Sequence, residues 1–371
     1  MLRTRISAVG CLVAALWFAG PAVAQEDPAP GLAGAALDAL HDRYDEHGRR
    51  INPIADLAGA LRATIVTPNT LGGGYTNNIV ITGYWPPTNE MLRAWSSNAT
   101  QNPGGWVGEN WEGRGYNVYA FFPEFPGGLG RGTGDFEVDY QDTSADWWSI
   151  VPALRPVAII TFSRANTTNG WELEGGNRTY ATGQWNNDYL APLQPTSDLP
   201  IIQLEPPLTV RNSTLPMQAI VDAVAAQVVG VNPFTTVVDD GRFLSNFIGY
   251  HGCWYHTMHA DPQDASWNVA SGHIHVGMNT NINAAIQATE VTLRVLIDHV
   301  DAAIAALPVP GDLNCDGLVN NFDIDPFVLA LTDPASYAAA FPTCDISRAD
   351  VNDDGLVNNF DIDPFVALLT E

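Results

Sequence analysis

Short apolar runs in the central part of the chain alternate with segments in which apolar residues recur at every third or fourth position. The runs contain few polar residues and predict buried strands. They are Asn78–Thr82, Asn117–Phe122, Val157–Phe162 and Pro200–Leu204. The segments Pro216–Val229 and Ile282–Leu307 show helical spacing instead. This alternation favours an α/β fold in three layers, with helices on both faces of a sheet.

The first residues have a different pattern. Arg3 and Arg5 precede an apolar run from Ile6 to Gly20, and the small residues Ala22–Ala24 follow it. This order is typical of a secretory signal peptide, so we expect residues 1–24 to be removed and the protein to be extracellular or periplasmic. Beyond this run, no apolar stretch is long enough to cross a membrane, and we expect no membrane span.

A second change of pattern occurs near the C-terminus, where the Pro-rich sequence Leu307–Gly311 predicts a hinge. We therefore expect the signal peptide to be followed by four parts. They are an N-terminal helical or extended segment at 25–77, an α/β domain at 78–306, a linker at 307–311 and a small all-α module at 312–371.

The charged residues of the chain exclude several classes of function. The 371 residues include 41 acidic and 16 basic side chains, which gives a formal charge of −25. Because no lysine occurs, a P-loop and Schiff-base catalysis are excluded. The acidic balance also argues against nucleic acid as a partner, because binding to phosphates requires a basic surface.

The C-terminal module contains the same pattern twice, as DLNCDGLVNNFDIDPFVLAL from Asp312 and as DVNDDGLVNNFDIDPFVALL from Asp350. Oxygen-bearing side chains at loop positions 1, 3, 5 and 12, a glycine at 6 and a carbonyl at 7 form the donor set of a calcium loop. The predicted ligands are Asp312, Asn314, Asp316, Leu318 and Asp323 in the first loop and Asp350, Asn352, Asp354, Leu356 and Asp361 in the second. A solvated acidic turn would explain one copy, but two matched copies favour two Ca²⁺ sites.

This duplicated loop–helix unit resembles a dockerin. The resemblance implies a cohesin-like protein partner that binds through the helices of the module. Both copies depart from the family by placing Asp-Pro, at Asp325-Pro326 and Asp363-Pro364, just inside the helix.

Three cysteines remain after removal of the signal peptide. Cys315 and Cys344 share the small C-terminal module, and an exported protein can form disulfides. We therefore predict a Cys315–Cys344 bridge and expect Cys253 to be a buried free thiol.

Candidate catalytic residues interrupt the apolar pattern of the central domain. A helix is predicted after Asp239-Asp240, with Ser245 within its first turns, where backbone N–H groups favour negative charge. Gly272–Val276 predicts a short strand that presents a histidine. A hydroxyl, an imidazole and a carboxylate together are the parts of a nucleophile, base and orienter arrangement.

These segments resemble pyroglutamyl peptidase I, the pyrrolidone-carboxylate peptidase family. Phe243–Tyr250 (FLSNFIGY) occupies the place of the family's Gly-aromatic-x-Cys-Asn segment, and His273–Val276 that of its aromatic-Ile-His-Val stretch. Glu172 stands five residues before Asn177, as the catalytic Glu of the family stands before an Asn. Thr82–Tyr84 match the Thr-Gly-Phe at the end of the first strand of the family, and the matches occur in the family's order.

The resemblance implies a peptidase-like hydrolase acting on a peptide or a small acyl substrate. It assigns Ser245 as the nucleophile, His275 as the base and Glu172 as the carboxylate that orients the base, with Glu174 as a rival. Tyr84 and Trp85 would form walls of the substrate pocket. Two departures are the serine in place of the family's cysteine and Ser163–Asn166 (SRAN) in place of its Gly-rich run.

Three other interpretations remain. Replacement of the nucleophile favours a catalytically inactive binding domain on a peptidase fold. Five clustered histidines favour metal-assisted hydrolysis, namely His251, His256, His259, His273 and His275. Abundant tryptophan together with a dockerin-like tail favours a carbohydrate-active module.

Overall fold

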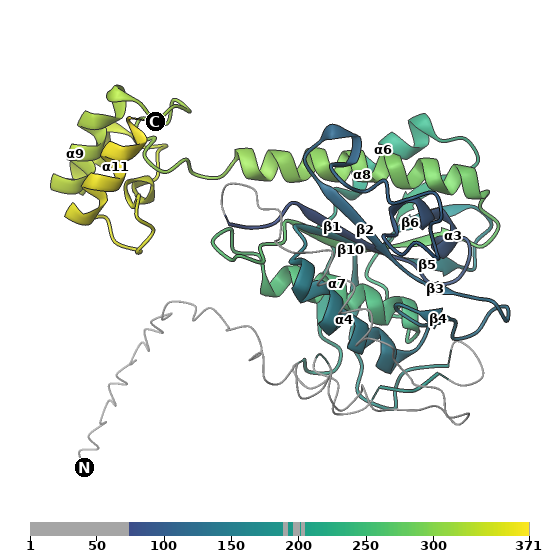
Figure 1. Cartoon of the computed structure of the whole chain (residues 1–371). Coiled ribbons are helices and arrows are strands. Elements are labelled where there is room, and N and C mark those ends of the chain that lie inside the picture. Colours follow the sequence, from purple (N-terminus) through teal and green to yellow (C-terminus); the bar gives the residue numbers. More distant parts are fainter. Residues whose placement is uncertain (1–73, 188–191, 196–200, 202–204, 371) are drawn as a thin grey trace, which may run out of the picture.

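The computed structural model describes residues 74–187, 192–195, 201 and 205–370 (Figure 1). The predicted signal peptide lies outside the described residues, as does the N-terminal segment up to residue 73. The predicted strand Pro200–Leu204 lies outside them as well, except for Ile201.

One six-stranded sheet organises the larger body of the protein, with the strand order β2-β1-β5-β10-β6-β9. Neighbouring strands from β2 to β10 are parallel, β6 is antiparallel to β10, and β9 is parallel to β6. The strands are β1 (Asn78–Thr82), β2 (Asn117–Phe121), β5 (Ala158–Ala165), β6 (Gly170–Leu173), β9 (Asn232–Thr235) and β10 (Ala270–Gly277).

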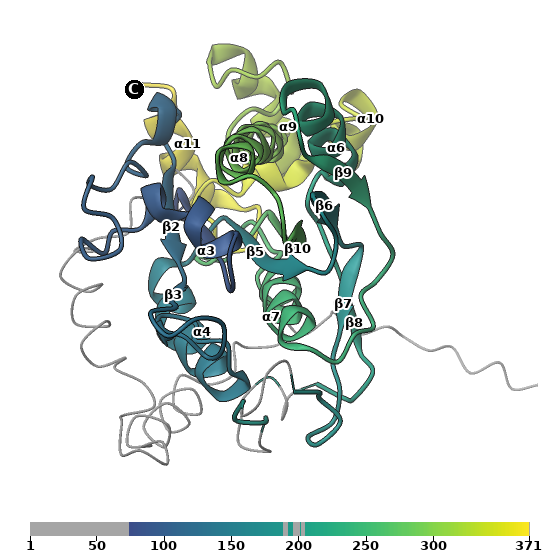
Figure 2. The same cartoon turned by 90° about the vertical axis from the view of Figure 1, so that its right-hand side faces the viewer.

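Helices cover both faces of this sheet (Figure 2). On one face lie α3 (Thr88–Met91), α6 (Met217–Gln227) and α8 (Ile282–Ala305), which share an apolar core with the sheet. On the other face lie α4 (Tyr140–Leu154) and α7 (Leu244–Met258), in a second core that is rich in aromatic residues. The predicted three-layer α/β fold is confirmed.

Alternation along three adjacent strands separates an apolar face from a polar face, because successive strand residues point to opposite sides of a sheet. The apolar residues join the core beneath α6 and α8, and they are Ile160, Phe162, Trp171, Leu173, Ile274 and Val276. The residues between them are polar and belong to the opposite, α7-covered face; they are Thr161, Ser163, Glu172, His273 and His275.

Two short strand pairs extend the larger body beyond the main sheet. β3 (Pro123–Glu124) pairs with β4 (Thr133–Gly134), and β7 (Gly176–Arg178) pairs with β8 (Val210–Asn212), both antiparallel. β7 begins three residues after β6 and therefore continues the chain from the sheet towards α7, against which it packs.

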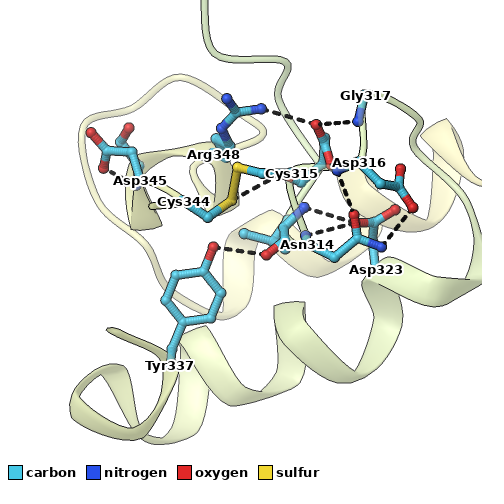
Figure 3. The surroundings of a disulfide bond; sticks show 12 residues. Asn314, Cys315, Asp316, Gly317, Asp323, Tyr337, Cys344, Asp345 and Arg348 are labelled. Carbon is cyan, nitrogen blue, oxygen red and sulfur yellow. Dashed lines mark hydrogen bonds and ion pairs between the residues drawn. A yellow bond between two sulfur atoms is a disulfide. The ribbon is translucent and has the colours of Figure 1, made fainter. Parts of the chain in front are cut away.

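The C-terminal module contains α9 (Ile324–Thr332), α10 (Pro334–Ala340) and α11 (Ile362–Leu368) (Figure 1). The repeat symmetry brings Phe327 of α9 and Phe365 of α11 into stacking contact, with ring centroids 4.0 Å apart. Cys315 and Cys344 form the predicted disulfide beside this core (Figure 3). No helix in the described part of the chain is both long and apolar enough to cross a membrane.

Candidate active site

An open cavity of about 710 Å³ lies at one end of the polar row on β5, β10 and β6. Its walls come from the ends of β5 and β6, from β10, from the segment between β9 and α7, and from the first turn of α7. Ser245 and His275 line this cavity, together with Glu172, Glu174 and Asp239. The fold therefore gathers the predicted nucleophile, base and acidic residues around one space.

His275 is held by Glu174. Its Nδ1 lies 2.5 Å from Oε1 of Glu174, and the side chains are only 16% and 2% exposed. Burial alone would lower the pKa of His275, but the charge of Glu174, its hydrogen bond to the ring and the charges of Asp239 and Glu172 together raise that pKa above its usual value. Burial likewise opposes ionisation of Glu174, yet the charge of His275 and the hydrogen bonds from His275 and Asn177 lower its pKa. The two groups thus form a buried ion pair.

This geometry corrects the assignment of Glu172 as the orienting carboxylate. Glu172 is directly opposite His275 in the β10–β6 ladder, but the carboxylate bonded to the ring is that of Glu174, just past the end of β6. Both glutamates fall on the same face of the strand, because they are two residues apart. Sequence spacing therefore could not distinguish them.

Glu174 is fixed from behind by a residue on β7. Asn177 Nδ2 donates to Glu174 Oε2 at 2.7 Å, and Asn177 Oδ1 accepts a weak hydrogen bond from the Cys253 thiol at 3.5 Å. A Cβ at Gly249 of α7 would lie 2.6 Å from Asn177 Nδ2, so the glycine permits this close approach. The sequence analysis noted Asn177 but not its role in orienting Glu174.

Ser245 is the second residue of α7 and is half-buried. The N-cap of α7 is Phe243, whose side chain has no oxygen to accept from the N–H groups of the first turn. Asn246 anchors this helix start, because its amide bonds both the N–H and the carbonyl of Arg178 as well as the carbonyl of Gly241. Ser245 and His275 line the same cavity without a direct hydrogen bond, as is common before a substrate is bound.

Ser245 therefore lies in the first turn of a helix whose start borders the cavity. N–H groups at a helix start can stabilise a developing oxyanion in acyl transfer. Cys253, two turns along α7, is fully buried, and burial raises the pKa of its thiol well above the usual value. A thiolate from Cys253 is thus not available to replace the family's nucleophile.

His273 is one of the five clustered histidines that suggested a metal site, but its ring is hydrogen-bonded to two hydroxyl groups. Its Nδ1 lies 2.7 Å from Thr161 Oγ1, and its Nε2 lies 2.8 Å from Ser163 Oγ. Burial lowers the pKa of His273 to about 3, so the ring is neutral. Ligand atoms of His273, His275 and Glu174 lie within 4.8 Å of one another, but both ring nitrogens of His273 already bond hydroxyl groups. The cluster is better described as a hydrogen-bonded support for the His275–Glu174 pair.

The other three histidines lie outside this cluster. His251 contacts Ser144 Oγ and the carbonyl of Phe247, and His256 contacts the carbonyl of Asn268. His259 pairs with Asp264 instead. Each ring is therefore engaged in its own packing contact, and the five histidines do not converge on one ion.

The predicted pocket walls are placed differently. Tyr84 is buried, and its hydroxyl bonds Thr143 Oγ1 at 2.6 Å within the α4-side core, so it does not line the cavity. Trp85 does not line the cavity either, but the guanidinium of Arg164 lies over its ring at 5.1 Å. Arg164 itself does line the cavity, as do Asn166 and Phe243. Trp85 therefore contacts a residue of the cavity wall.

The two C-terminal loops share one pattern of backbone contacts. In the first, Asp312 accepts from the N–H groups of Asp316 and Gly317, and Asp323 accepts from those of Leu313 and Asn314. Each bond recurs 38 positions later, on Asp350 and Asp361. Hard oxygens on a loop that turns at a glycine with positive φ fit the preferences of Ca²⁺.

No family model and no curated protein matches the chain. Among solved structures, pyrrolidone carboxyl peptidase from Thermococcus litoralis is 16% identical, with a TM-score of 0.42, and the match covers 61% of this chain and 96% of that one. The pyrrolidone carboxyl peptidase of Pyrococcus furiosus is 14% identical, with a TM-score of 0.42 over 60% of this chain and 99% of that one. At this level of similarity, the geometry of the site itself has to carry any functional argument.

Proposed function

We propose that the α/β domain is a hydrolase of amide or related acyl bonds, with Ser245 as the nucleophile, His275 as the general base and Glu174 as the orienting carboxylate. The observation that carries the proposal is the His275–Glu174 ion pair in the same cavity as a serine at a helix start. This is the set of parts that serine hydrolases use on unrelated folds.

The geometry suggests how each group acts. Glu174 accepts a hydrogen bond from Nδ1–H, which leaves Nε2 of His275 to take the proton from Ser245 Oγ as the oxygen attacks the carbonyl carbon. N–H groups of the first turn of α7 stabilise the oxyanion. His275 then gives the proton to the leaving group, and an ester forms on Ser245. Water, deprotonated by His275, attacks the ester, releases the acid and restores the serine.

Fluorogenic amides, including a pyroglutamyl amide, test this mechanism with the wild type, Ser245→Ala and Ser245→Cys. Turnover that Ser245→Ala abolishes would support the serine mechanism. The alternative is an inactive peptidase-fold binding domain, and it would lead if only Ser245→Cys turned substrate over. If none of the three proteins turned over any of the substrates, the proposed hydrolase would be rejected.

We further propose that the C-terminal module binds two calcium ions and docks a cohesin-like protein. The ten predicted ligands would hold the ions, which would cross-link each loop to the helix after it. Docking is favoured by symmetry-related apolar side chains on the module surface, since Phe322 and Phe360 are each 71% exposed.

Calorimetric titration of the protein with calcium should give two bound ions per chain. Asp316→Ala and Asp354→Ala should each remove one of them, and an absence of calcium binding would reject both sites.

We also propose that the protein is exported, because residues 1–24 have the pattern of a signal peptide. The Cys315–Cys344 disulfide suits an oxidising compartment. Mass spectrometry of the protein from its native culture should place the mature N-terminus at Gln25, and a retained residue 1 would reject processing.

A further inference from the structure

The walls of the cavity carry more negative than positive charge. Glu172, Glu174, Asp239 and Asp240 line it, against Arg164 and the imidazole of His275. Glu174 is neutralised by His275, and the guanidinium of Arg164, which lies over Trp85, offsets one further negative charge. Three carboxylates, those of Glu172, Asp239 and Asp240, therefore face a single guanidinium among the lining residues.

Glu172 is a direct neighbour of the proposed base across the ladder. Residues opposite each other in an antiparallel ladder have Cβ atoms about 5 Å apart on the same face, and Glu172 is opposite His275. Burial, followed by the charge of Glu174, raises the pKa of Glu172 against the attraction of His275. The carboxylate of Glu172 forms no ion pair or hydrogen bond with the described residues.

Carboxylates that surround a partly desolvated cavity repel one another, and this repulsion destabilises the protein when no ligand is bound. A bound cation relieves the repulsion. Because Glu172 is opposite the proposed base, a cation paired with it would lie close to the scissile carbonyl. An open volume of about 710 Å³ is large enough for an amino-acid residue and its leaving group.

We propose that this cavity selects substrates that carry an ammonium group on the residue of the scissile carbonyl, with Glu172 as its counter-ion. The inference rests on the proposed hydrolase and names its substrate class. An α-ammonium group of an N-terminal residue and the side-chain ammonium of lysine share this chemistry, whereas a pyroglutamyl group has neither.

Four fluorogenic amides separate the sources: alanyl, N-acetyl-alanyl, N-acetyl-lysyl and pyroglutamyl. We expect wild-type kcat/KM to be about tenfold to a hundredfold higher for an ammonium-bearing substrate than for N-acetyl-alanyl amide, the range of a charge-assisted hydrogen bond. Preference for the alanyl amide would assign an α-ammonium, and preference for the N-acetyl-lysyl amide a side chain. Glu172→Gln should reduce the ratio to near one.

The matched control is Glu109→Gln, which makes the same chemical change at an exposed site before β2, with β1, β5 and β10 between that strand and β6. It should keep the wild-type ratio. Equal rates for N-acetyl-alanyl amide and both ammonium-bearing amides would overturn the inference but leave the hydrolase standing. Inhibition by Zn²⁺ without any amine preference would assign the carboxylates to a metal and overturn it as well.

If no amide is turned over, calorimetric binding of alanyl-alanine and N-acetyl-alanyl-alanine to Ser245→Ala decides the inference separately. Selective binding of the free amine would support the ammonium site while the hydrolase fails. Equal binding of both, or binding of neither, would overturn the site.

Discussion

The charge of His275 is set by burial and by the carboxylates around it. Burial favours a neutral imidazole, whereas Glu174, followed by Asp239 and Glu172, favours the protonated one, and the balance raises the pKa of His275 above 6.5. Only the neutral ring can accept the proton of Ser245. The rate of acyl transfer should therefore rise with pH through the pKa of His275 and level off above it.

Replacing Glu174 by Gln should lower kcat/KM by about 10²- to 10⁴-fold, because the imidazolium formed in the transition state loses its counter-ion. The same change should move the rise in the pH–rate profile to lower pH, since burial then dominates the pKa of His275. A pH–rate profile of both proteins measures the shift. A profile that stays in place would contradict the pairing.

A second residue-scale effect concerns Asp135, a buried carboxyl whose pKa burial raises from 3.8 to about 7. The native state therefore binds its proton more tightly than the unfolded state does. That stabilisation is complete below pH 3.8 and is lost as pH rises to 7. The neutral amide of Asp135→Asn avoids the loss.

Relative to wild type, Asp135→Asn should accordingly gain up to about 4 kcal/mol of unfolding free energy between about pH 4 and about pH 8, at roughly 1.36 kcal/mol per pH unit. Urea denaturation at the two pH values measures this difference. The control is Asp222→Asn, the same chemical change at an exposed position of α6. A gain that is the same at both pH values would contradict the buried charge.

The sequence led to Ser245 and His275 and left the carboxylate open between Glu172, the preferred assignment, and Glu174, its rival. Glu172 and Glu174 share one strand face, and the choice between them depends on where β6 ends and β7 begins. That turn is set by contacts with α7, far away in the sequence. Local patterns carry no information about it.

At the level of elements, α7 combines three tasks. Its first turn places Ser245, Asn246 ties that turn to β7, and Gly249 allows Asn177 to reach Glu174. The position of one helix therefore controls both the nucleophile and the orientation of the base.

Gly249→Ala tests this coupling, because its Cβ would lie 2.6 Å from Asn177 Nδ2. We expect a loss of about 1–3 kcal/mol in stability from overpacking. We also expect a lower kcat, because displacement of Asn177 disturbs Glu174 while the nucleophile Ser245 is unchanged. The control is Gly252→Ala in the same helix, whose Cβ would meet ordinary contacts at 3.8 Å or more. Thermal unfolding and kinetics of both variants measure the effect; equal stability of the two would contradict the close approach.

Elements with long, regular patterns were predicted well. The strand Asn78–Thr82 has the predicted bounds, and the predicted long helix is observed as Ile282–Ala305. β6 and β9 were missed, because each has only four residues and lacks a continuous apolar run. Their pairing is stabilised by the sheet as a whole and not by their own sequence.

At the scale of the whole molecule, the two repeated C-terminal loops have the same backbone pattern but different surroundings. Arg348 Nη1 lies 3.0 Å from Asp312 Oδ2 of the first loop (Figure 3). The position that corresponds to Arg348 before the first repeat is Pro310, which cannot provide a cation for Asp350. The first loop therefore shares a carboxylate with a guanidinium, and the second has no arginine at the matching position.

Arg348→Gln should consequently tighten calcium binding at the first loop by roughly fivefold, as about 1 kcal/mol of competing attraction is removed. The titration is made in chains that carry Asp354→Ala, so that only the first loop is measured. A dissociation constant that stays equal or becomes weaker would contradict competition at Asp312.

The account depends most directly on Ser245 being an activated nucleophile. Treatment of the intact protein with a fluorophosphonate, followed by peptide mass spectrometry, tests this without knowledge of the substrate. We predict one phosphonyl adduct on Ser245, slower labelling in Glu174→Gln and wild-type labelling in Ser347→Ala, an exposed serine of the module. Absence of an adduct on Ser245, or equal labelling of the Ser245→Ala protein, would contradict the proposed active site.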